Sequence, residues 1–169
     1  MSGGFPVGLG AEFSEERVHR YLLWRVWSAE KPPLGFVMLN PSSADEKRDD
    51  ATTVRNMRRA RVLGYGGVVQ ANLYSYRTPS PKALFAAGAP GFVLNDDGNL
   101  RAWARVAEAC DDVVLAWGAH ADVQHAKLAV GFLASCAKPL RLLHLGRLKD
   151  GAPRHPLHTA YAAPLQEWD

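Results

Sequence analysis

Short apolar runs that alternate with helical patterns constrain the fold of this chain more than any other feature. The runs cover residues 34–39, 67–73, 112–117 and 140–145, and each ends abruptly at polar or turn-forming residues. A strand that is buried on both faces has this appearance. Helical patterns lie between the runs, at residues 53–63, 82–87, 96–110 and 121–137. Because strands that alternate with helices are joined by right-handed crossovers, we expect an α/β fold, a three-layer α/β/α sandwich around a four-stranded parallel sheet.

The N-terminal part of the chain adds one strand to this expectation. Residues 20–27 are rich in aromatic and branched side chains and precede Pro32 and Pro33. This pattern predicts an N-terminal edge strand of the sheet. Residues 1–18 are expected to be a flexible segment. A chain of 169 residues and 18.5 kDa is the size of a single domain, residues 1–169.

Composition excludes several classes of protein. Hydrophobic residues make up 47% and charged residues 22%, which excludes a disordered chain. The net charge of +3 permits a nucleic-acid or phosphate partner without requiring one.

No run approaches the roughly 18 apolar residues of a membrane span, so no membrane partner is expected. Cys110 and Cys136 are too few for a disulfide framework, which favours the cytoplasm. Neither cysteine nor histidine spacing predicts a metal site, and no cofactor is expected. The oligomeric state stays open.

The ends of the predicted strands indicate where a site would be. In an open parallel sheet, ligands bind beyond the carboxyl ends of the strands, where the strand order reverses. Those ends carry mainly neutral amides and one histidine: Asn40, Asn72, Trp117-Gly118 and His155. The sequence contains no G-x-S-x-G, no G-x-x-x-x-G-K-[ST] and no G-x-G-x-x-G motif. Serine hydrolases of the nucleophile-elbow type, P-loop proteins and dinucleotide-binding proteins are therefore excluded.

Amides and a histidine suit the cleavage of an N-glycosidic bond. Such a bond to a pyrimidine can break dissociatively, which leaves a cationic sugar and an anionic base. An asparagine carbonyl can hold the attacking water, and a second asparagine can read a base edge because its amide both donates and accepts. A histidine can donate a hydrogen bond to a base oxygen.

The strand-end motifs resemble those of the uracil-DNA glycosylase superfamily. The resemblance rests on Leu-Asn-Pro-Ser at 39–42, Asn-Leu-Tyr-Ser-Tyr-Arg-Thr-Pro at 72–79, Ala-Trp-Gly at 116–118 and His-Pro-Leu at 155–157. It implies a glycosylase-like fold with the sheet order 2-1-3-4. It also implies that Asn40 positions the water, Asn72 reads the base and His155 stabilises the base anion.

Four motifs resemble a second group more closely, a bacterial and phage family described only as a domain of unknown function. They span residues 38–45, 49–52, 72–74 and 151–157. The sequence also departs from the glycosylase pattern. Leu157 stands where the His-Pro-Ser motif has its serine, Ser42 replaces a glycine, and no aromatic residue lies between Asn40 and Asp50.

These observations define the candidate site. Its catalytic candidates are Asn40, Asp50 and His155. Asp50 joins them because the 49–52 cluster has no glycosylase counterpart. The candidates for binding the base or ligand are Pro41, Ser42, Asp49, Thr52, Asn72, Tyr74, Arg77, Trp117, Gly118 and Arg154.

Each candidate also has a structural interpretation. Asn40 and Asn72 are residues that stabilise turns and loop ends. Asp50 or Thr52 is suited to cap a helix that starts near residue 53. Trp117 is equally a core residue or a stacking wall. The arginines of the predicted helix 53–63 either form a solvated face or follow a nucleic-acid backbone. They are Arg55, Arg58, Arg59 and Arg61.

Two functions are consistent with this sequence. The first is a glycosylase-like hydrolase that acts on a pyrimidine or modified base in DNA or a nucleotide, as in DNA repair or modification. The second is a non-catalytic module that binds a base, a nucleotide or nucleic acid in a similar pocket.

Overall fold

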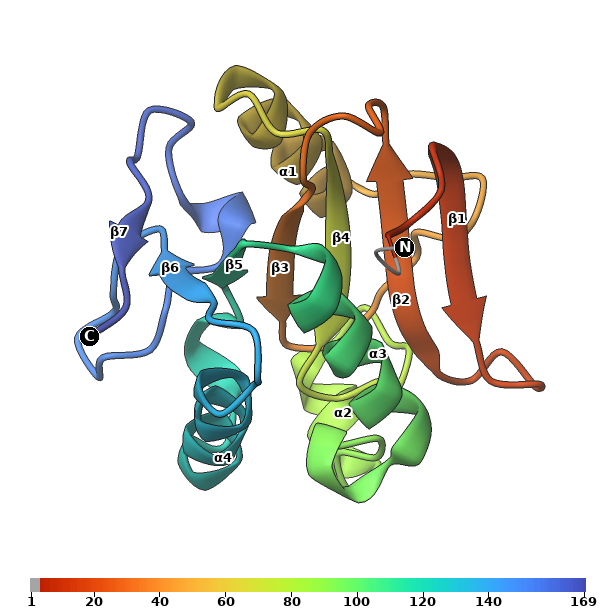
Figure 1. Ribbon diagram of the computed structural model, residues 1–169. Coiled ribbons are helices and arrows are strands. Elements are labelled where there is room, and N and C mark those ends of the chain that lie inside the picture. Colours follow the sequence, from red (N-terminus) through yellow and green to blue (C-terminus); the bar gives the residue numbers. More distant parts are fainter. Residues whose placement is uncertain (1–3) are drawn as a thin grey trace.

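The computed structural model describes residues 4–169, and within them the strands form one mixed sheet (Figure 1). The order of the strands is β1-β2-β4-β3-β5-β6-β7. Their bounds are β1 (Gly8–Phe13), β2 (Arg20–Val26), β3 (Leu34–Met38), β4 (Gly67–Asn72), β5 (Asp112–Leu115), β6 (Arg141–His144) and β7 (Gln166–Glu167).

The directions of the strands correct the expected sheet. β3 pairs in parallel with β4 and with β5, and β5 pairs in parallel with β6. These strands correspond to the four apolar runs, and they are neighbours in the order 2-1-3-4. The sheet as a whole is not a four-stranded parallel sheet, because β1, β2 and β7 join it in antiparallel pairs. β7 has only two residues, both exposed, so its sequence carries no strand pattern.

The predicted N-terminal edge strand lies inside the sheet. β2 is paired on both sides, with β1 and with β4, so the prediction of an edge strand at residues 20–27 is wrong. The edge is β1, which falls within the segment expected to be flexible. Gly8 and Gly10 weaken the strand pattern of β1. Gly10 is nevertheless required there, because a Cβ at this position would collide with the Trp24 ring on β2.

Helices cover both faces of the sheet (Figure 1). On one face, α1 packs through Ala60 against strand residues such as Phe36 and Val68. On the other face, α3 and α4 pack against strand residues such as Val37 and Val113. The expected three layers are therefore present. The helices are α1 (Ala51–Val62), α2 (Pro81–Ala86), α3 (Asp97–Ala109) and α4 (Val123–Ala134), with 3₁₀ turns at Val93–Asn95, Gly118–His120 and Pro156–His158.

Aspartates define where three of these helices begin. The side chains of Asp50, Asp96 and Asp122 each accept a hydrogen bond from a backbone N–H in the first turn of α1, α3 and α4. The cap at Asp50 starts α1 two residues earlier than the apolar pattern predicts. The start of α1 therefore lies beside the carboxyl ends of β3 and β4. None of the helices in residues 4–169 is long and apolar enough to span a membrane.

Candidate functional site

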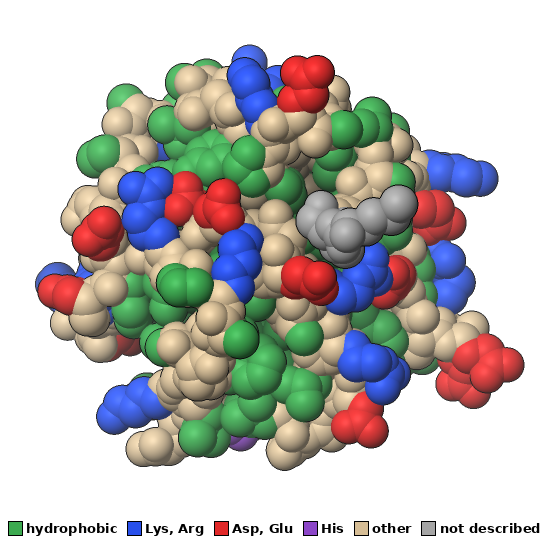
Figure 2. Space-filling view, in the orientation of Figure 1, with side chains coloured by type: hydrophobic (Ala, Val, Ile, Leu, Met, Phe, Trp, Pro, Cys, Tyr) green, Lys and Arg blue, Asp and Glu red, His purple; other side chains and the backbone are tan. Residues whose placement is uncertain are grey.

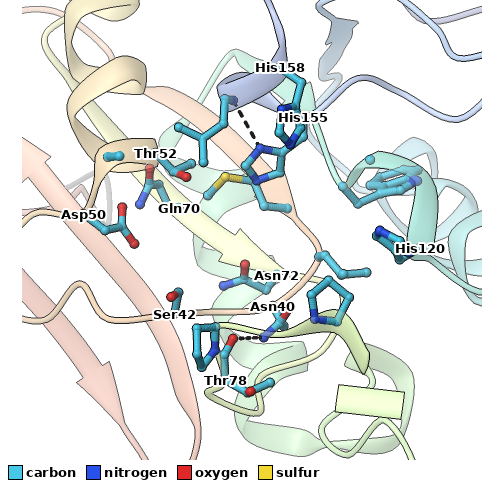
Figure 3. A pocket seen from close by; sticks show the side chains of 18 of the residues that line it. Asn40, Ser42, Asp50, Thr52, Gln70, Asn72, Thr78, His120, His155 and His158 are labelled. Atoms are coloured by element: carbon cyan, nitrogen blue, oxygen red, sulfur yellow. Dashed lines mark hydrogen bonds between the residues drawn. The ribbon is translucent and has the colours of Figure 1, made fainter. Parts of the chain in front are cut away.

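A cleft of about 790 Å³ opens at the carboxyl ends of β3, β4 and β5 (Figure 3). The start of α1 and the loop after β6 complete its walls. Most of the predicted site residues line it: Asn40, Ser42, Asp50, Thr52, Asn72, Trp117, Gly118, Arg154 and His155. Segments far apart in the sequence thus meet at one point, where the strand order reverses around β3.

Four predicted ligand-binding residues do not line this cleft. Tyr74 is fully buried, and its hydroxyl forms a hydrogen bond of 2.8 Å with His125 Nδ1. Pro41 is buried as well, and its carbonyl accepts hydrogen bonds from Asn40 Nδ2 and Thr78 N. Both residues are therefore engaged in contacts within the protein and do not face a ligand in the cleft.

Asp49 and Arg77 have structural partners. Asp49 Oδ1 accepts a hydrogen bond of 2.7 Å from Arg25 Nε, which anchors the loop before α1 to β2. Arg77 Nη1 donates to the Arg17 carbonyl, and its guanidinium lies over the Phe13 ring. Both residues were predicted to bind the ligand because they lie next to the motifs in the sequence. Their side chains instead contact Arg25 and Arg17.

The amide of Asn40 is oriented by backbone carbonyls. Its Nδ2 donates to the carbonyls of Pro41 (3.1 Å), Tyr76 (3.3 Å) and Thr78 (2.8 Å). All three partners can only accept, so the assignment of Nδ2 and Oδ1 is fixed. Within residues 4–169, Oδ1 accepts no hydrogen bond. Asn40 therefore presents its side-chain carbonyl oxygen, Oδ1, in a fixed position as a hydrogen-bond acceptor for a ligand in the cleft.

Asn72 is a buried amide without partners. Its side chain is 1% exposed, and neither Nδ2 nor Oδ1 has a hydrogen-bond partner among the described residues. Its neighbour Gln70 also lines the cleft, but Gln70 Oε1 accepts from Asn56 Nδ2 and Gln70 Nε2 donates to Thr53 Oγ1. Leaving a buried donor and acceptor unpaired is costly, and native proteins do so rarely.

His155 presents a neutral imidazole to the cleft. Burial, together with the nearby His158, lowers its pKa from the ordinary 6.5 to about 4, although Asp50 acts in the opposite direction. Its Nδ1 accepts a hydrogen bond of 3.2 Å from the backbone N–H of Leu157 (Figure 3). The neutral ring therefore carries its proton on Nε2, which is a hydrogen-bond donor.

Gly118 positions the loop that carries His155. Its N–H donates to the Pro153 carbonyl at 2.9 Å, which joins the end of β5 to this loop. Its φ of +77° lies in the left-handed region, and a Cβ would lie 3.4 Å from His155 Cβ. The neighbouring Trp117 is a core residue, 3% exposed, that also lines the cleft, and its use as a stacking wall stays a prediction.

Asp50 caps α1 and faces the cleft at the same time. Its Oδ1 accepts a hydrogen bond of 2.8 Å from Thr53 N, which confirms the helix-cap interpretation for Asp50. In the described part of the chain, Oδ2 has no hydrogen-bond partner. Thr52 is the second residue of α1, so it does not cap the helix. Asp50 therefore serves the helix with one oxygen and presents the other to the cleft.

Two arginines of α1 hold the later part of the chain. Arg55 donates to the carbonyls of Pro156 (3.0 Å) and Thr159 (2.6 Å). Arg59 donates to the carbonyls of residues 160, 161 and 163. The guanidinium of Arg61 stacks over Trp27. These contacts argue against both the solvated-face and the nucleic-acid interpretation for Arg55 and Arg59, because most of their donors bind backbone carbonyls of the same chain. Arg58 and Arg61 are exposed, as on a solvated face.

Several residues of the cleft were not found from the sequence. They are Arg20, Gln70, Thr78, His120 and His158. Arg20 escaped notice because residues 20–27 were expected at the edge of the sheet. Gln70 is the polar interruption of an apolar strand, which is a signal that could have identified it. Among residues 4–169, no three His, Cys, Asp or Glu side chains are grouped as metal ligands would be.

Comparison with known proteins identifies a family but no activity. The model of a family described as "Protein of unknown function (DUF1643)" matches residues 20–157. No curated protein and no solved structure matches the chain. These comparisons provide no evidence for a relationship to the uracil-DNA glycosylases.

Proposed function

The chain belongs to the DUF1643 family, and from its strand-end cleft we propose that it binds a pyrimidine-like base and hydrolyses the N-glycosidic bond of that base. The observation that carries the proposal is the buried, unpartnered amide of Asn72 in the cleft that also holds Asn40 and His155. The resemblance of the motifs to those of glycosylases is consistent with this proposal.

Asn72 is suited to read a base. A uracil-type edge offers an N–H donor beside a carbonyl acceptor, and a primary amide matches both. Binding of such an edge would satisfy Nδ2 and Oδ1 of Asn72 together. Neither atom has a hydrogen-bond partner among the described residues, so this pairing breaks no hydrogen bond within the protein. Both atoms are buried, so the wall of the cleft has to shift to admit the base edge.

Asn40 and His155 are suited to the chemistry. The C1′–N bond breaks with its electron pair leaving on the base, and Nε2–H of His155 donates a hydrogen bond to the resulting anion. A water held by Asn40 Oδ1 then bonds to C1′, and its proton ends on the released base. The carboxylate of Asp50 favours the positive charge that develops on the sugar. A neutral His155 donates without itself losing a proton.

The release of free base tests this proposal. Purified protein is incubated with uracil-containing single- and double-stranded DNA, with deoxyuridine and with deoxyuridine 5′-monophosphate, and free uracil is measured by chromatography. We expect release from at least one of them, and Asn40→Ala should abolish it. Asn95→Ala, at an exposed position outside the cleft, is the matched control that retains activity. Circular dichroism verifies that each variant is folded. The absence of release from every substrate would remove the hydrolase proposal.

One observation favours a binding module instead. Leu157 lines the cleft with an exposed apolar side chain, 40% accessible, where the glycosylase motif has a serine. A module of this kind would bind the base through Asn72 without cleaving it. Binding that Asn72→Ala abolishes, in the absence of any base release by the wild-type protein, would identify this second function.

A further inference from the structure

Arg20 is a buried cation of the cleft without an ion-pair partner. Its side chain is 2% exposed, and it lines the cleft beside the start of α1. It makes one hydrogen bond, from Nη1 to the Ala44 carbonyl at 2.7 Å, and its Nε has no partner among the described residues. No carboxylate of residues 4–169 lies within ion-pair distance of it.

Arg25, on the same strand, is a buried arginine whose side-chain nitrogens all have hydrogen-bond partners. It is equally buried, but its Nε pairs with Asp49 at 2.7 Å. Its remaining contacts are hydrogen bonds to the carbonyls of Gly10, Trp24, Asp45 and Arg48. A buried charge is normally compensated in this way. The contrast identifies Arg20 as the buried cation of the cleft that lacks compensation.

Other features of the cleft favour an anion at the same place. Burial lowers the pKa of Arg20 to about 10, with Asp50 partly offsetting the shift, so the guanidinium stays charged at neutral pH. The backbone N–H groups of Ala51 and Thr52 are the first two of the twelve-residue helix α1. They have no acceptor in the described chain, and both residues line the cleft. Free N–H groups at the start of a helix bind anions.

We propose that Arg20 and the start of α1 form a phosphate subsite, so that the ligand of the cleft is a nucleoside monophosphate. This inference rests on the proposed base recognition by Asn72 and adds the group that is bound beside the base. Arg20 donates from its guanidinium to the phosphate oxygens, which compensates its buried charge.

The surroundings favour a mononucleotide over a nucleic-acid strand. The cleft has the size of a small-molecule site. Arg55 and Arg59, which would otherwise provide a basic track, donate to backbone carbonyls of the same chain. Over the face of the molecule in Figure 2, which is not the one that bears the histidines of the cleft, basic and acidic side chains are interspersed as well. A polyanion is bound by clustered basic residues instead.

Pseudouridine and its 5′-monophosphate test the inference without turnover, because their base is joined to the sugar through carbon. Isothermal titration calorimetry should show that the wild-type protein binds the monophosphate at least about tenfold more tightly, as expected for charge-assisted hydrogen bonds to a buried guanidinium. Arg20→Met should lose this preference and retain its affinity for the nucleoside. Arg101→Met removes an exposed charge outside the cleft and is the matched control that retains the preference.

Asp50→Asn provides a test of opposite sign. Asparagine retains the helix cap but removes the negative charge near the phosphate, so the affinity for the monophosphate should rise severalfold. Equal wild-type affinities for nucleoside and monophosphate would overturn the subsite, whether or not Arg20→Met folds. A preference that persists in a folded Arg20→Met protein would overturn it as well.

Two further probes separate the inference from the proposed function. If inorganic phosphate binds in an Arg20-dependent manner but neither pseudouridine compound does, the phosphate subsite stands and the base recognition fails. If the nucleoside binds and the monophosphate binds no better, the base recognition stands and the subsite fails. A uracil-containing single-stranded oligonucleotide that binds much more tightly than the monophosphate, with strong salt dependence, would overturn the choice of a mononucleotide.

Discussion

Gln70 and Asn72 lie two residues apart on β4 and line the same cleft, yet only the amide of Gln70 is hydrogen-bonded. Gln70 contacts Asn56 and Thr53 on α1 and so joins the sheet to the helix. Asn72 also lines the cleft, but its amide has no partner in residues 4–169. We therefore assign a structural role to the amide of Gln70 and a ligand-binding role to the amide of Asn72.

Substitution of these two amides should have different effects on stability. Gln70→Ala leaves Asn56 and Thr53 with unpaired buried groups and should lower the free energy of unfolding by about 1–3 kcal/mol. Asn72→Ala removes two unsatisfied atoms and should leave that free energy within about 1 kcal/mol of the wild type, while base binding is lost. Urea denaturation measures both effects. A large loss of stability in Asn72→Ala would show that the amide has a structural role.

The pKa of His155 predicts a pH dependence of stability. In the unfolded chain the imidazole titrates near 6.5, but in the folded protein its pKa is about 4. Between these values the unfolded state binds more protons, so stability falls as the pH is lowered from about 6.5 to about 4. His155→Asn keeps an acceptor for Leu157 N but does not titrate, so its thermal unfolding should lose this part of the pH dependence. Identical pH profiles would contradict the lowered pKa.

Asp50 combines a helix cap with a charge, and two substitutions separate them. Asp50→Asn keeps the cap and should retain stability, whereas Asp50→Ala should lose about 1 kcal/mol. Base release should fall by at least about tenfold in both, because both lose the charge that favours the cationic sugar. Thermal unfolding and chromatographic detection of free base measure the two effects. Full activity in Asp50→Asn would restrict Asp50 to the helix cap.

Two glycines should respond to alanine with opposite signs. Gly118→Ala forces a left-handed backbone on alanine beside His155 and should cost about 1–2 kcal/mol. Gly131 lies within α4, and a Cβ there has no neighbour within 4 Å. Gly131→Ala should therefore raise stability by about 0.5–1 kcal/mol. Denaturant titrations of both variants test this pair, and the prediction fails if the signs agree.

Arg55 and Arg58 both lie over the Tyr161 ring, but only Arg55 binds backbone carbonyls. Arg55→Met should lower stability by about 1.5–3 kcal/mol and increase hydrogen exchange in residues 156–163. Arg58→Met is the matched control and should change stability by less than about 0.5 kcal/mol. Equal effects of the two substitutions would mean that the carbonyl contacts of Arg55 contribute nothing.

The parallel centre of the fold could be predicted because its strands are mainly apolar runs. Residues 34–39 and 112–117 are short apolar runs typical of strands buried on both faces, and the helical patterns between them favour parallel crossovers. β1 and β7 could not be found in this way, because glycines interrupt one and the other has two exposed residues. Their strand character comes from pairing with a neighbour.

The candidate site was predicted where a residue follows directly on a buried strand. Asn72 is the last residue of β4, and Asn40 and Trp117 come two residues after the ends of β3 and β5, so the strand-end rule brings all three together. The direction of a side chain in a loop is not encoded by its spacing, which is why Asp49 and Arg77 point to other partners. Arg20 belongs to the cleft only because β2 lies between two strands, a pairing that its local sequence does not specify.

The bond between Arg55 and Thr159 spans 104 residues of the chain. It fixes the turn that follows His155 to a helix synthesised long before it. On a ribosome, the part of the cleft formed by Asn40, Asn72 and α1 emerges first, and His155 follows only when the loop after β6 is made. Completion of the cleft therefore depends on a contact of high sequence separation, which can form only after the loop beyond β6 has been synthesised.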